Sequence, residues 1–211
     1  DRSLLVFGGG GLSKSIIDVV RQRGKLEPLC VVDDGLEVGA DVLGVPVVGG
    51  RATLGALHGH GLVRAVNAVG AIGDIGTRVA IFEALGEHGF ELPVVVDVSA
   101  SVAASAQLAD GAQVFALAMV GSEAHIGRGA IVNSGAIVSH DCEIGAYTHV
   151  APGALLAGEV RVGESVLVGM GVTARVGLRI GDGAIIGNGS TLRGDVESGT
   201  IVSAGSVWPR D

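Results

Sequence analysis

The stretch NSGAIVSHDCEIGAYTHVAPGALLAGEVRVG, residues 133–163, carries an aliphatic residue at every sixth position. The spacing continues in both directions without an insertion, from Val96 to Glu197, which makes seventeen consecutive hexads. A period of six fits neither an amphipathic helix nor a single pleated strand. It is typical of a parallel β-helix of short strands and tight corners, and the many glycines suit those corners.

Two positions of each hexad are expected to face the interior. The first holds large aliphatic residues in the series Val96, Val102, Leu108, Val114, Val120, Ile126, Val132, Val138, Ile144, Val150, Leu156, Val162, Val168, Ala174, Ile180, Ile186 and Leu192. The second, four residues later, holds smaller side chains and runs from Ala100 to Val196. If three hexads form one triangular coil, residues eighteen apart lie above one another, separated by about 4.8 Å.

Length and composition limit the classes of protein that this chain can represent. The 211 residues allow two domains with a sizeable core, so neither a disulfide nor a structural metal is needed. Cys30 and Cys142 both lie in apolar surroundings, as expected of inert thiols in a reduced, cytoplasmic protein. We expect neither a signal peptide nor a membrane span, because the apolar run near the start breaks after four residues into glycines. A net charge of −8 argues against a nucleic-acid partner.

The N-terminal part, residues 1–93, has the pattern of a small Rossmann-like α/β domain. An apolar strand at residues 3–7 runs into four glycines at 8–11, and Ser13 is a candidate cap for a helix that continues to Gly24. A second strand, LCVVDD at residues 29–34, ends in two acids. Strand, glycine turn, helix and strand in this order open a dinucleotide-type fold.

The glycine turn predicts an anion site, because backbone N–H groups at the start of the helix favour a pyrophosphate. A carboxylate of Asp33 or Asp34 would then hydrogen-bond a ribose or a base. Gly73, Asp74 and Arg78 stand where another strand end meets a helix start. Since Ser13 replaces the third glycine of the fingerprint, a turn that merely connects strand and helix is an equal alternative.

His140 is the candidate for chemistry on the β-helix. It occupies an outward position of its hexad, and eighteen residues later the same corner holds Gly158, which has no side chain to block a ligand. Asp141 would orient the imidazole and increase its basicity. The alternative is that these are ordinary solvated surface residues.

The eighteen-residue register also predicts two columns of arginines on the β-helix. Arg161 and Arg179 stack between Glu143 and Glu197, which predicts a compensated, structural ladder. In the second column, Arg175 and Arg193 stack without a nearby carboxylate, one residue from the column of His140. The second column would suit the phosphates of a long ligand whose reactive end lies at His140, although two solvated arginines are the simpler interpretation.

A zinc site is a further candidate, since some β-helix proteins bind zinc through three histidines. His125, His140 and His149 are separated by 15 and 9 residues, so no pair is in register within one chain. We therefore expect no metal.

Residues 133–163 make the chain resemble a known family, the two-domain sugar acetyltransferases of the sialic-acid, bacillosamine and perosamine pathways. The GGGG turn, VDD at residues 32–34 and the VGAIGD loop resemble it more loosely. Family members join a nucleotide-sugar-binding α/β domain to a left-handed β-helix of hexapeptide repeats, here residues 94–211. They act as homotrimers with the active site between neighbouring β-helices.

The resemblance also implies roles for single residues. Acetyl-CoA would be the donor, and His140, supported by Asp141, would be the general base toward the acceptor amine. The residues expected to bind acetyl-CoA are His149, Gly158, Met170, Arg175 and Arg193. Those expected to bind the nucleotide sugar are Gly10, Gly11, Leu12, Asp33, Asp34 and Gly73. Leu12 stands where the family often has histidine, and SAGSVWPRD replaces the usual C-terminal ending.

The resemblance implies N-acetylation of a nucleotide-linked 4-amino-4,6-dideoxy sugar, with GDP-perosamine favoured among GDP-, UDP- and dTDP-linked candidates. O-acetylation of a sialic-acid-type sugar by the same base is the nearest alternative. Two alternatives belong to other classes: an NAD-dependent enzyme that uses Asp33, and a noncatalytic nucleotide-sugar sensor.

Overall fold

A computed structural model describes residues 2–70 and 75–209 of the chain. The chain divides into two compact units, Asp1–Val98 and Ser99–Asp211. The boundary expected from the sequence, after Pro93, falls inside the first of them. None of the helices in the described part is long and apolar enough to cross a membrane.

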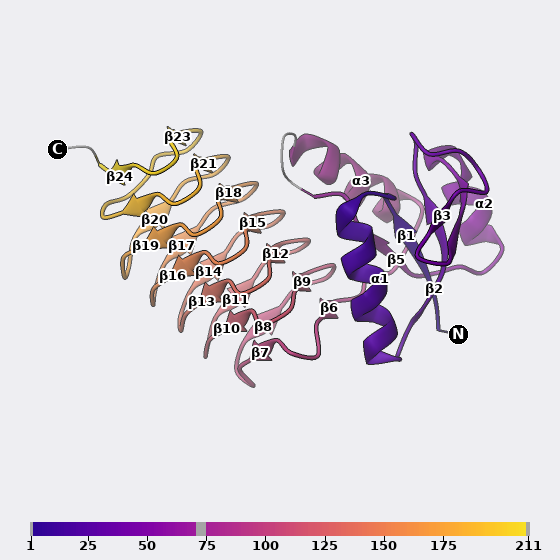
Figure 1. Ribbon diagram of the computed structural model, residues 1–211, viewed down its shortest axis with the longest axis horizontal. Coiled ribbons are helices and arrows are strands. Elements are labelled where there is room, and N and C mark those ends of the chain that lie inside the picture. Colours follow the sequence, from indigo (N-terminus) through magenta and orange to yellow (C-terminus); the bar gives the residue numbers. More distant parts are fainter. Residues whose placement is uncertain (1, 71–74, 210–211) are drawn as a thin grey trace. The chain divides into compact units, whose positions relative to one another are not determined.

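The first unit is the small α/β fold predicted from the sequence (Figure 1). Its sheet has the strand order β3-β4-β2-β1-β5, in which β4, β2, β1 and β5 are mutually parallel and β3 is antiparallel to β4. The elements in chain order are β1 (Ser3–Phe7), α1 (Gly11–Arg23), β2 (Glu27–Val32), β3 (Asp41–Val42), β4 (Val45–Gly49), η1 (Arg51–Thr53), α2 (Leu54–Gly59), β5 (Ala65–Asn67), α3 (Ile75–Glu87) and β6 (Val95–Val96).

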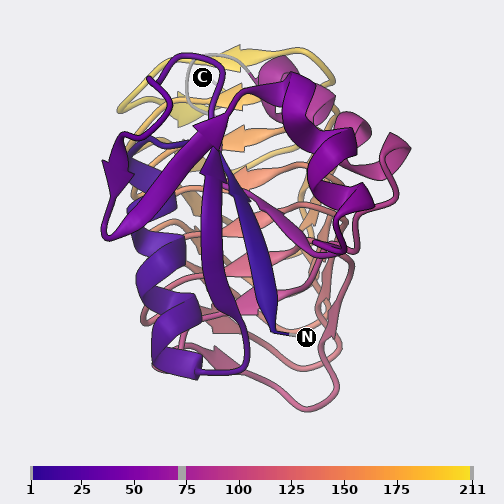
Figure 2. The ribbon, with the colours of Figure 1, turned by 90° about the vertical axis from the view of Figure 1, so that its right-hand side faces the viewer.

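The central strand β1 fixes where the loops of this unit meet. Four consecutive residues, Leu4 to Phe7, are buried, and β1 pairs with β2 on one side and with β5 on the other. Figure 2 shows β1 and β2 side by side. Because β1, β2 and β4 are parallel, their carboxyl ends and the loops that follow lie at one edge of the sheet.

Helix α1 begins earlier than the sequence indicated. Its N-cap is Gly10, with extended backbone angles, and the helix starts at Gly11, so the prediction that Ser13 is the cap was wrong. Ser13 lies in the first turn, is fully buried, and its hydroxyl donates to the Gly10 carbonyl. The glycine turn therefore runs directly into the helix with no side chain capping its first N–H groups.

The second unit is a left-handed β-helix whose strands lie in three parallel sheets (Figure 1). The first sheet contains β7 (Ser101–Val102), β10 (Met119–Val120), β13 (Ile137–Val138), β16 (Leu155–Leu156), β19 (Thr173–Ala174), β22 (Thr191–Leu192) and β24 (Val207–Trp208). The second contains β8 (Gln107–Leu108), β11 (His125–Ile126), β14 (Glu143–Ile144), β17 (Arg161–Val162) and β20 (Arg179–Ile180). The third includes β9 (Gln113–Val114), β12 (Ile131–Val132), β15 (His149–Val150), β18 (Leu167–Val168), β21 (Ile185–Ile186) and β23 (Ile201–Val202).

The predicted register holds over most of this unit. Strand partners are eighteen residues apart, as in Ile137 with Leu155, and both interior series are buried from Ala112 to Leu192. A backbone with positive φ recurs at every sixth residue from Gly111 to Gly189, one at each corner. The period of six residues therefore sets the spacing of the corners as well as the spacing of the core residues.

The register changes in the last coil. Ile180 bridges to Val196, and Ile185 pairs with Ile201, so partners there are sixteen residues apart. The prediction of uninterrupted hexads to Glu197 was therefore wrong, because the corner after Leu192 is two residues shorter than the others. As a result Val196 takes a strand position rather than the small interior one.

Candidate active site

His140 lies at the corner between β13 and β14, where the chain leaves the first sheet of the β-helix for the second. Its side chain is 61% exposed, and its Nδ1 is 2.7 Å from Oδ2 of Asp141. Asp141 adopts the left-handed backbone conformation with φ of 59°, which turns its carboxylate back toward the preceding residue. This contact favours a proton on Nδ1, so that Nε2 carries the lone pair and can act as a base.

Gly158 packs against the ring of His140, as the eighteen-residue register predicted. A Cβ atom on Gly158 would lie 2.5 Å from Cε1 and 2.6 Å from Nε2 of the imidazole. Any side chain at this position would therefore displace the ring. In the described part of the chain the Gly158 N–H donates no hydrogen bond to another backbone group, although its carbonyl accepts one from Gly177 at 2.9 Å. The imidazole thus lies against the backbone of Gly158 with no side chain between them.

The residues expected to bind acetyl-CoA lie in three places. Arg175 and Arg193 are exposed and share the edge of His140, two and three coils further along. Neither arginine forms an ion pair with a described residue. Met170, 49% exposed, lies on a different edge, between β18 and β19. His149 is buried on β15, and its Nε2 is 3.0 Å from Nδ2 of Asn133, so one chain does not bring it to His140.

The second sheet of the β-helix carries the charged ladder beside this edge. Arg161 pairs with Glu143 at 3.5 Å, which confirms the lower half of the expected column. The upper half of the expected column was wrong, because the short last coil puts Asp195 where Glu197 was expected. The backbone N–H of Arg179 donates to Oδ1 of Asp195 at 2.8 Å.

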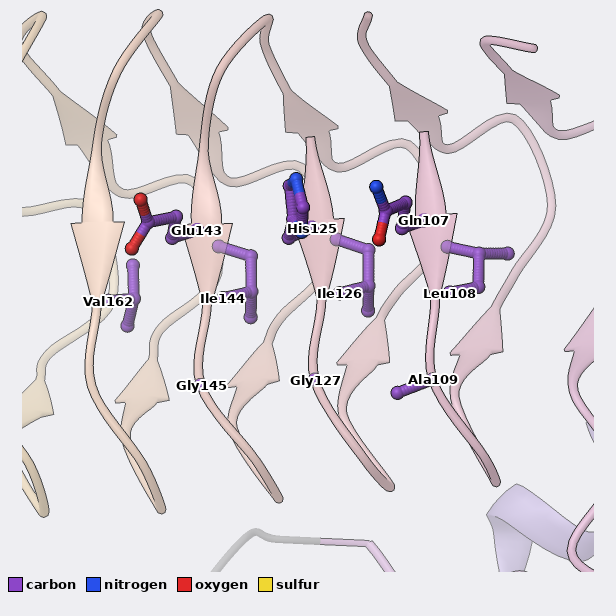
Figure 3. A pocket seen from close by; sticks show the side chains of 10 residues that line it. All are labelled: Gln107, Leu108, Ala109, His125, Ile126, Gly127, Glu143, Ile144, Gly145 and Val162. Atoms are coloured by element: carbon purple, nitrogen blue, oxygen red, sulfur yellow. The ribbon is translucent and has the colours of Figure 1, made fainter. Parts of the chain in front are cut away.

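Two hollows follow the outer face of this sheet. One, of about 480 Å³, has Gln107, His125 and Glu143 in a row across three strands (Figure 3). The other, of about 730 Å³, is lined by Asp141 together with Glu123, Glu143, Glu159, Arg161 and Arg179. The carboxylate that holds His140 therefore opens onto a polar groove. Among the residues that the structure describes, no group of three or more His, Cys, Asp and Glu side chains could hold a metal ion.

In the α/β unit no described side chain covers the glycine turn. Among the described residues, a Cβ atom on Gly10 or Gly11 would meet no atom of another segment within 4 Å, so none of them fills the space beside the first turn of α1. Gly9 differs, because a side chain there would collide with Leu36. Leu12 is half-buried at the start of the same helix. Gly73 lies outside the described residues.

Asp33 and Asp34 already have partners within the protein. Asp33 accepts hydrogen bonds from three backbone N–H groups, those of Gly9 at 2.7 Å, Gly35 at 2.8 Å and Leu36 at 3.0 Å. Asp34 accepts one from the Arg51 N–H at 2.6 Å and pairs with the Arg51 guanidinium at 3.5 Å. The two acids thus connect the glycine turn to the end of β4, and their contact with a ribose or a base stays a prediction.

Sequence reasoning missed Arg51 and left Arg78 without a detailed role. Arg51 follows β4 and faces the same edge as Asp34. Arg78 is fully buried: its guanidinium donates to the Val69 carbonyl and lies 4.9 Å from the centre of the Phe82 ring. Burial lowers the pKa of Arg78 to about 9, so it stays protonated at neutral pH. The strand–Gly–Gly–Arg sequence at residues 47–51 was the available signal for Arg51.

Comparisons with known proteins agree with both units. Residues 3–85 match the PglD N-terminal domain, and residues 123–158 match the six-repeat bacterial transferase hexapeptide family. A search among curated proteins gives no match.

Three solved structures cover nearly the whole chain. PerB from Caulobacter crescentus, in complex with CoA and GDP-perosamine, is 36% identical, with 94% of this chain and 92% of that one covered and a TM-score of 0.88. A histidine-to-alanine variant of GDP-perosamine N-acetyltransferase from the same organism, with the same ligands, is 35% identical over the same shares, with a TM-score of 0.89.

The acetyltransferase domain of PglB from Neisseria gonorrhoeae, in complex with acetyl coenzyme A, is 32% identical, with 95% of both chains covered and a TM-score of 0.87. All three are enzymes that transfer acetyl groups. Together with the match of each unit, they show that this chain belongs to the family of acetyl-CoA-dependent sugar N-acetyltransferases that join a PglD-type N-terminal domain to a hexapeptide-repeat β-helix.

Proposed function

We propose that this protein transfers the acetyl group of acetyl-CoA to the amine of a GDP-linked 4-amino-4,6-dideoxy sugar, with GDP-perosamine as the preferred acceptor. The observation that carries the proposal is the geometry at one corner of the β-helix. There a carboxylate holds His140 at 2.7 Å, and Gly158 leaves the space beside Nε2 without a side chain. The relatives that bind CoA with GDP-perosamine support the choice of both substrates.

The reaction needs one base and one stabilised oxyanion. The amine nitrogen attacks the thioester carbonyl carbon, and its proton passes to Nε2 of His140. The negative charge that develops on the carbonyl oxygen is stabilised by the Gly158 N–H. Breaking the carbon–sulfur bond releases the CoA thiolate, which takes up the proton from His140. Asp141 keeps the imidazole oriented throughout, and the products are the N-acetylated sugar and CoA thiol.

The ligand contacts follow from the same arrangement. Arg175 and Arg193 extend the edge of His140 with two positive charges, which suits the phosphates of CoA. The open turn at Gly10 and Gly11, at the start of α1, suits the diphosphate of the sugar nucleotide. Leu12 and Gly73 complete this proposed nucleotide-sugar site.

We propose a homotrimer because one chain does not gather the acetyl-CoA residues at one edge. Met170 and His140 lie at different corners of the coil. A neighbouring copy could bring its Met170 corner to the His140 corner and so complete the site. Light scattering of the purified protein should give three times 20.9 kDa, and a monomer that is fully active would contradict this assembly.

The test of function is an acetyl-transfer assay on a panel of acceptors. The purified protein is incubated with acetyl-CoA and GDP-, UDP- or dTDP-linked 4-amino sugars, or with a sialic acid as a hydroxyl acceptor. Release of CoA thiol and the mass of the product are measured. The highest kcat/KM is expected for GDP-perosamine. Faster transfer to the sialic acid would establish O-acetylation instead, and no transfer to any acceptor would refute the proposal.

A further inference from the structure

Three strand ends are joined by hydrogen bonds at the carboxyl edge of the α/β sheet. The carboxylate of Asp33, which follows β2, accepts a hydrogen bond from the N–H of Gly9, which follows β1. The backbone N–H of Asp33 donates to the Gly49 carbonyl of β4 at 2.9 Å. Asp34 binds the N–H of Arg51. The polypeptide that would surround a nucleotide is therefore fixed before any ligand arrives.

Arg51 is the cation that this framework holds at the edge. Its guanidinium lies 3.5 Å from Oδ2 of Asp34 and 6.0 Å from the centre of the Phe7 ring, the last residue of β1. The side chain is nevertheless 44% exposed. An arginine fork carries five N–H donors, and the ion pair with Asp34 occupies only some of them. The ion pair and the ring restrict the orientation of the guanidinium plane, and its exposed part leaves donors available to a ligand.

The acids beside Arg51 already have partners in the protein. Asp33 accepts hydrogen bonds from three backbone N–H groups, and Asp34, whose side chain is 52% exposed, is paired with Arg51 itself. A ligand at this edge therefore meets carboxylates that already accept hydrogen bonds, next to the remaining donors of Arg51. In dinucleotide-type folds the diphosphate binds at the glycine turn and the nucleoside extends over the end of the second strand. That path leads from Gly10 past Asp34 to Arg51.

On the basis of the proposed function, we propose that Arg51 selects the nucleobase of the sugar nucleotide by donating two hydrogen bonds to O6 and N7 of guanine. Guanine presents these two acceptors side by side, which matches the arginine fork. On the corresponding edge, adenine offers the N7 acceptor next to the N6 donor, and uracil offers the O4 carbonyl next to the C5–H group. Only guanine therefore satisfies two donors of Arg51 at once.

The test is the affinity of the full chain for free GDP, UDP and ADP, measured by calorimetry. Arg51→Met removes the donors, and Arg51→Lys keeps the charge but not the fork. Arg64→Met is the matched control, because Arg64 forms a comparable ion pair with Glu91, at 3.0 Å, in the same unit. We expect Arg51→Met to weaken GDP binding by roughly tenfold to a hundredfold, and UDP binding by less than about threefold.

The other variants sharpen the expected result. Arg51→Lys should recover little of the loss for GDP, since a single point charge cannot replace a bidentate contact. Arg64→Met should leave the order of the three affinities unchanged. In acetyl transfer, Arg51→Met should raise KM for the GDP-linked sugar and leave kcat within about twofold.

Each contrary result has a definite meaning. Equal losses for GDP and UDP would show that Arg51 serves the phosphates or the ribose, and would overturn the proposal. Unchanged affinities, or a wild-type protein that prefers UDP, would overturn it as well. A wild-type protein that acetylates GDP-linked amino sugars while Arg51→Met keeps the preference for GDP refutes only this inference. Absence of acetyl transfer by the wild-type protein refutes the proposed function.

Discussion

The two units of this protein hold their functional residues in different ways. In the β-helix, His140 meets Gly158 because eighteen residues make one coil, so a regular repeat determines the contact. In the α/β unit, Asp33 and Asp34 are held by backbone N–H groups from three different loops. A repeat positions side chains through its constant number of residues per coil, whereas loops position them through individual hydrogen bonds. Mutations in the β-helix should therefore affect catalysis, and mutations in the α/β unit should affect ligand binding together with stability.

The largest effect is expected from removing the base. His140→Asn preserves size and polarity but cannot accept a proton at neutral pH, so kcat should fall by roughly a hundredfold to ten-thousandfold. Affinity for GDP, which we place on the α/β unit, should stay within about twofold of the wild-type value. Steady-state kinetics and calorimetry measure the two quantities. Near-normal turnover would remove His140 from the mechanism.

The second effect tests the contact between coils. Gly158→Ala introduces a methyl group where the imidazole lies, so the ring must move from Gly158 and Nε2 loses its position. We expect kcat to fall by roughly tenfold to a hundredfold, while thermal unfolding changes little because the ring can swing into solvent. Val176→Ala, one coil further at the same edge, is a suitable control because its side chain is 54% exposed. A fully active Gly158→Ala enzyme would contradict the proposed geometry.

The third effect concerns the loops. Asp33→Ala leaves the N–H groups of Gly9, Gly35 and Leu36 without their acceptor, and should lower the free energy of unfolding by about 1–3 kcal/mol. GDP affinity should fall with it, because Gly9 belongs to the glycine turn. Asp34→Ala removes one N–H contact and one exposed ion pair, so its loss of stability should be smaller. Denaturant titration compares the two, and the reverse order would contradict this interpretation.

The smallest effect is a dependence on pH in the α/β unit. Burial raises the pKa of the Cys30 thiol from 9.0 to about 11. Between these two values the unfolded chain has lost the thiol proton while the folded chain keeps it, so the stability falls as the pH rises. Cys30→Ala should make that fall shallower between pH 9 and 11, as measured by urea titration at several pH values. Identical slopes for both proteins would refute this contribution.

The sequence predicted the two-unit architecture and the contact of His140 with Gly158, because a period of six leaves little freedom in the register. It failed after Leu192, where two residues are missing from a corner. Val196 and Val202 are aliphatic in either register, so the composition gave no sign of the change. It also missed the partners of Asp33 and Asp34, since those depend on loops that are distant in sequence. Hydrophobic patterns report which side chains are buried, but not which loops lie next to each other.

The shortened corner after Leu192 shows what the β-helix can accommodate. Ile185 pairs with Ile201 sixteen residues on, and the indole N–H of Trp208 donates to the Asp195 carbonyl at 2.9 Å. This turn therefore has a smaller perimeter than the eighteen-residue turns below it. Parallel pairing nevertheless continues across it, because Ile186 pairs with Val202 and Thr191 with Val207. A deletion confined to one corner thus leaves the sheets intact, so the corners are where the length of a coil can vary without loss of the core.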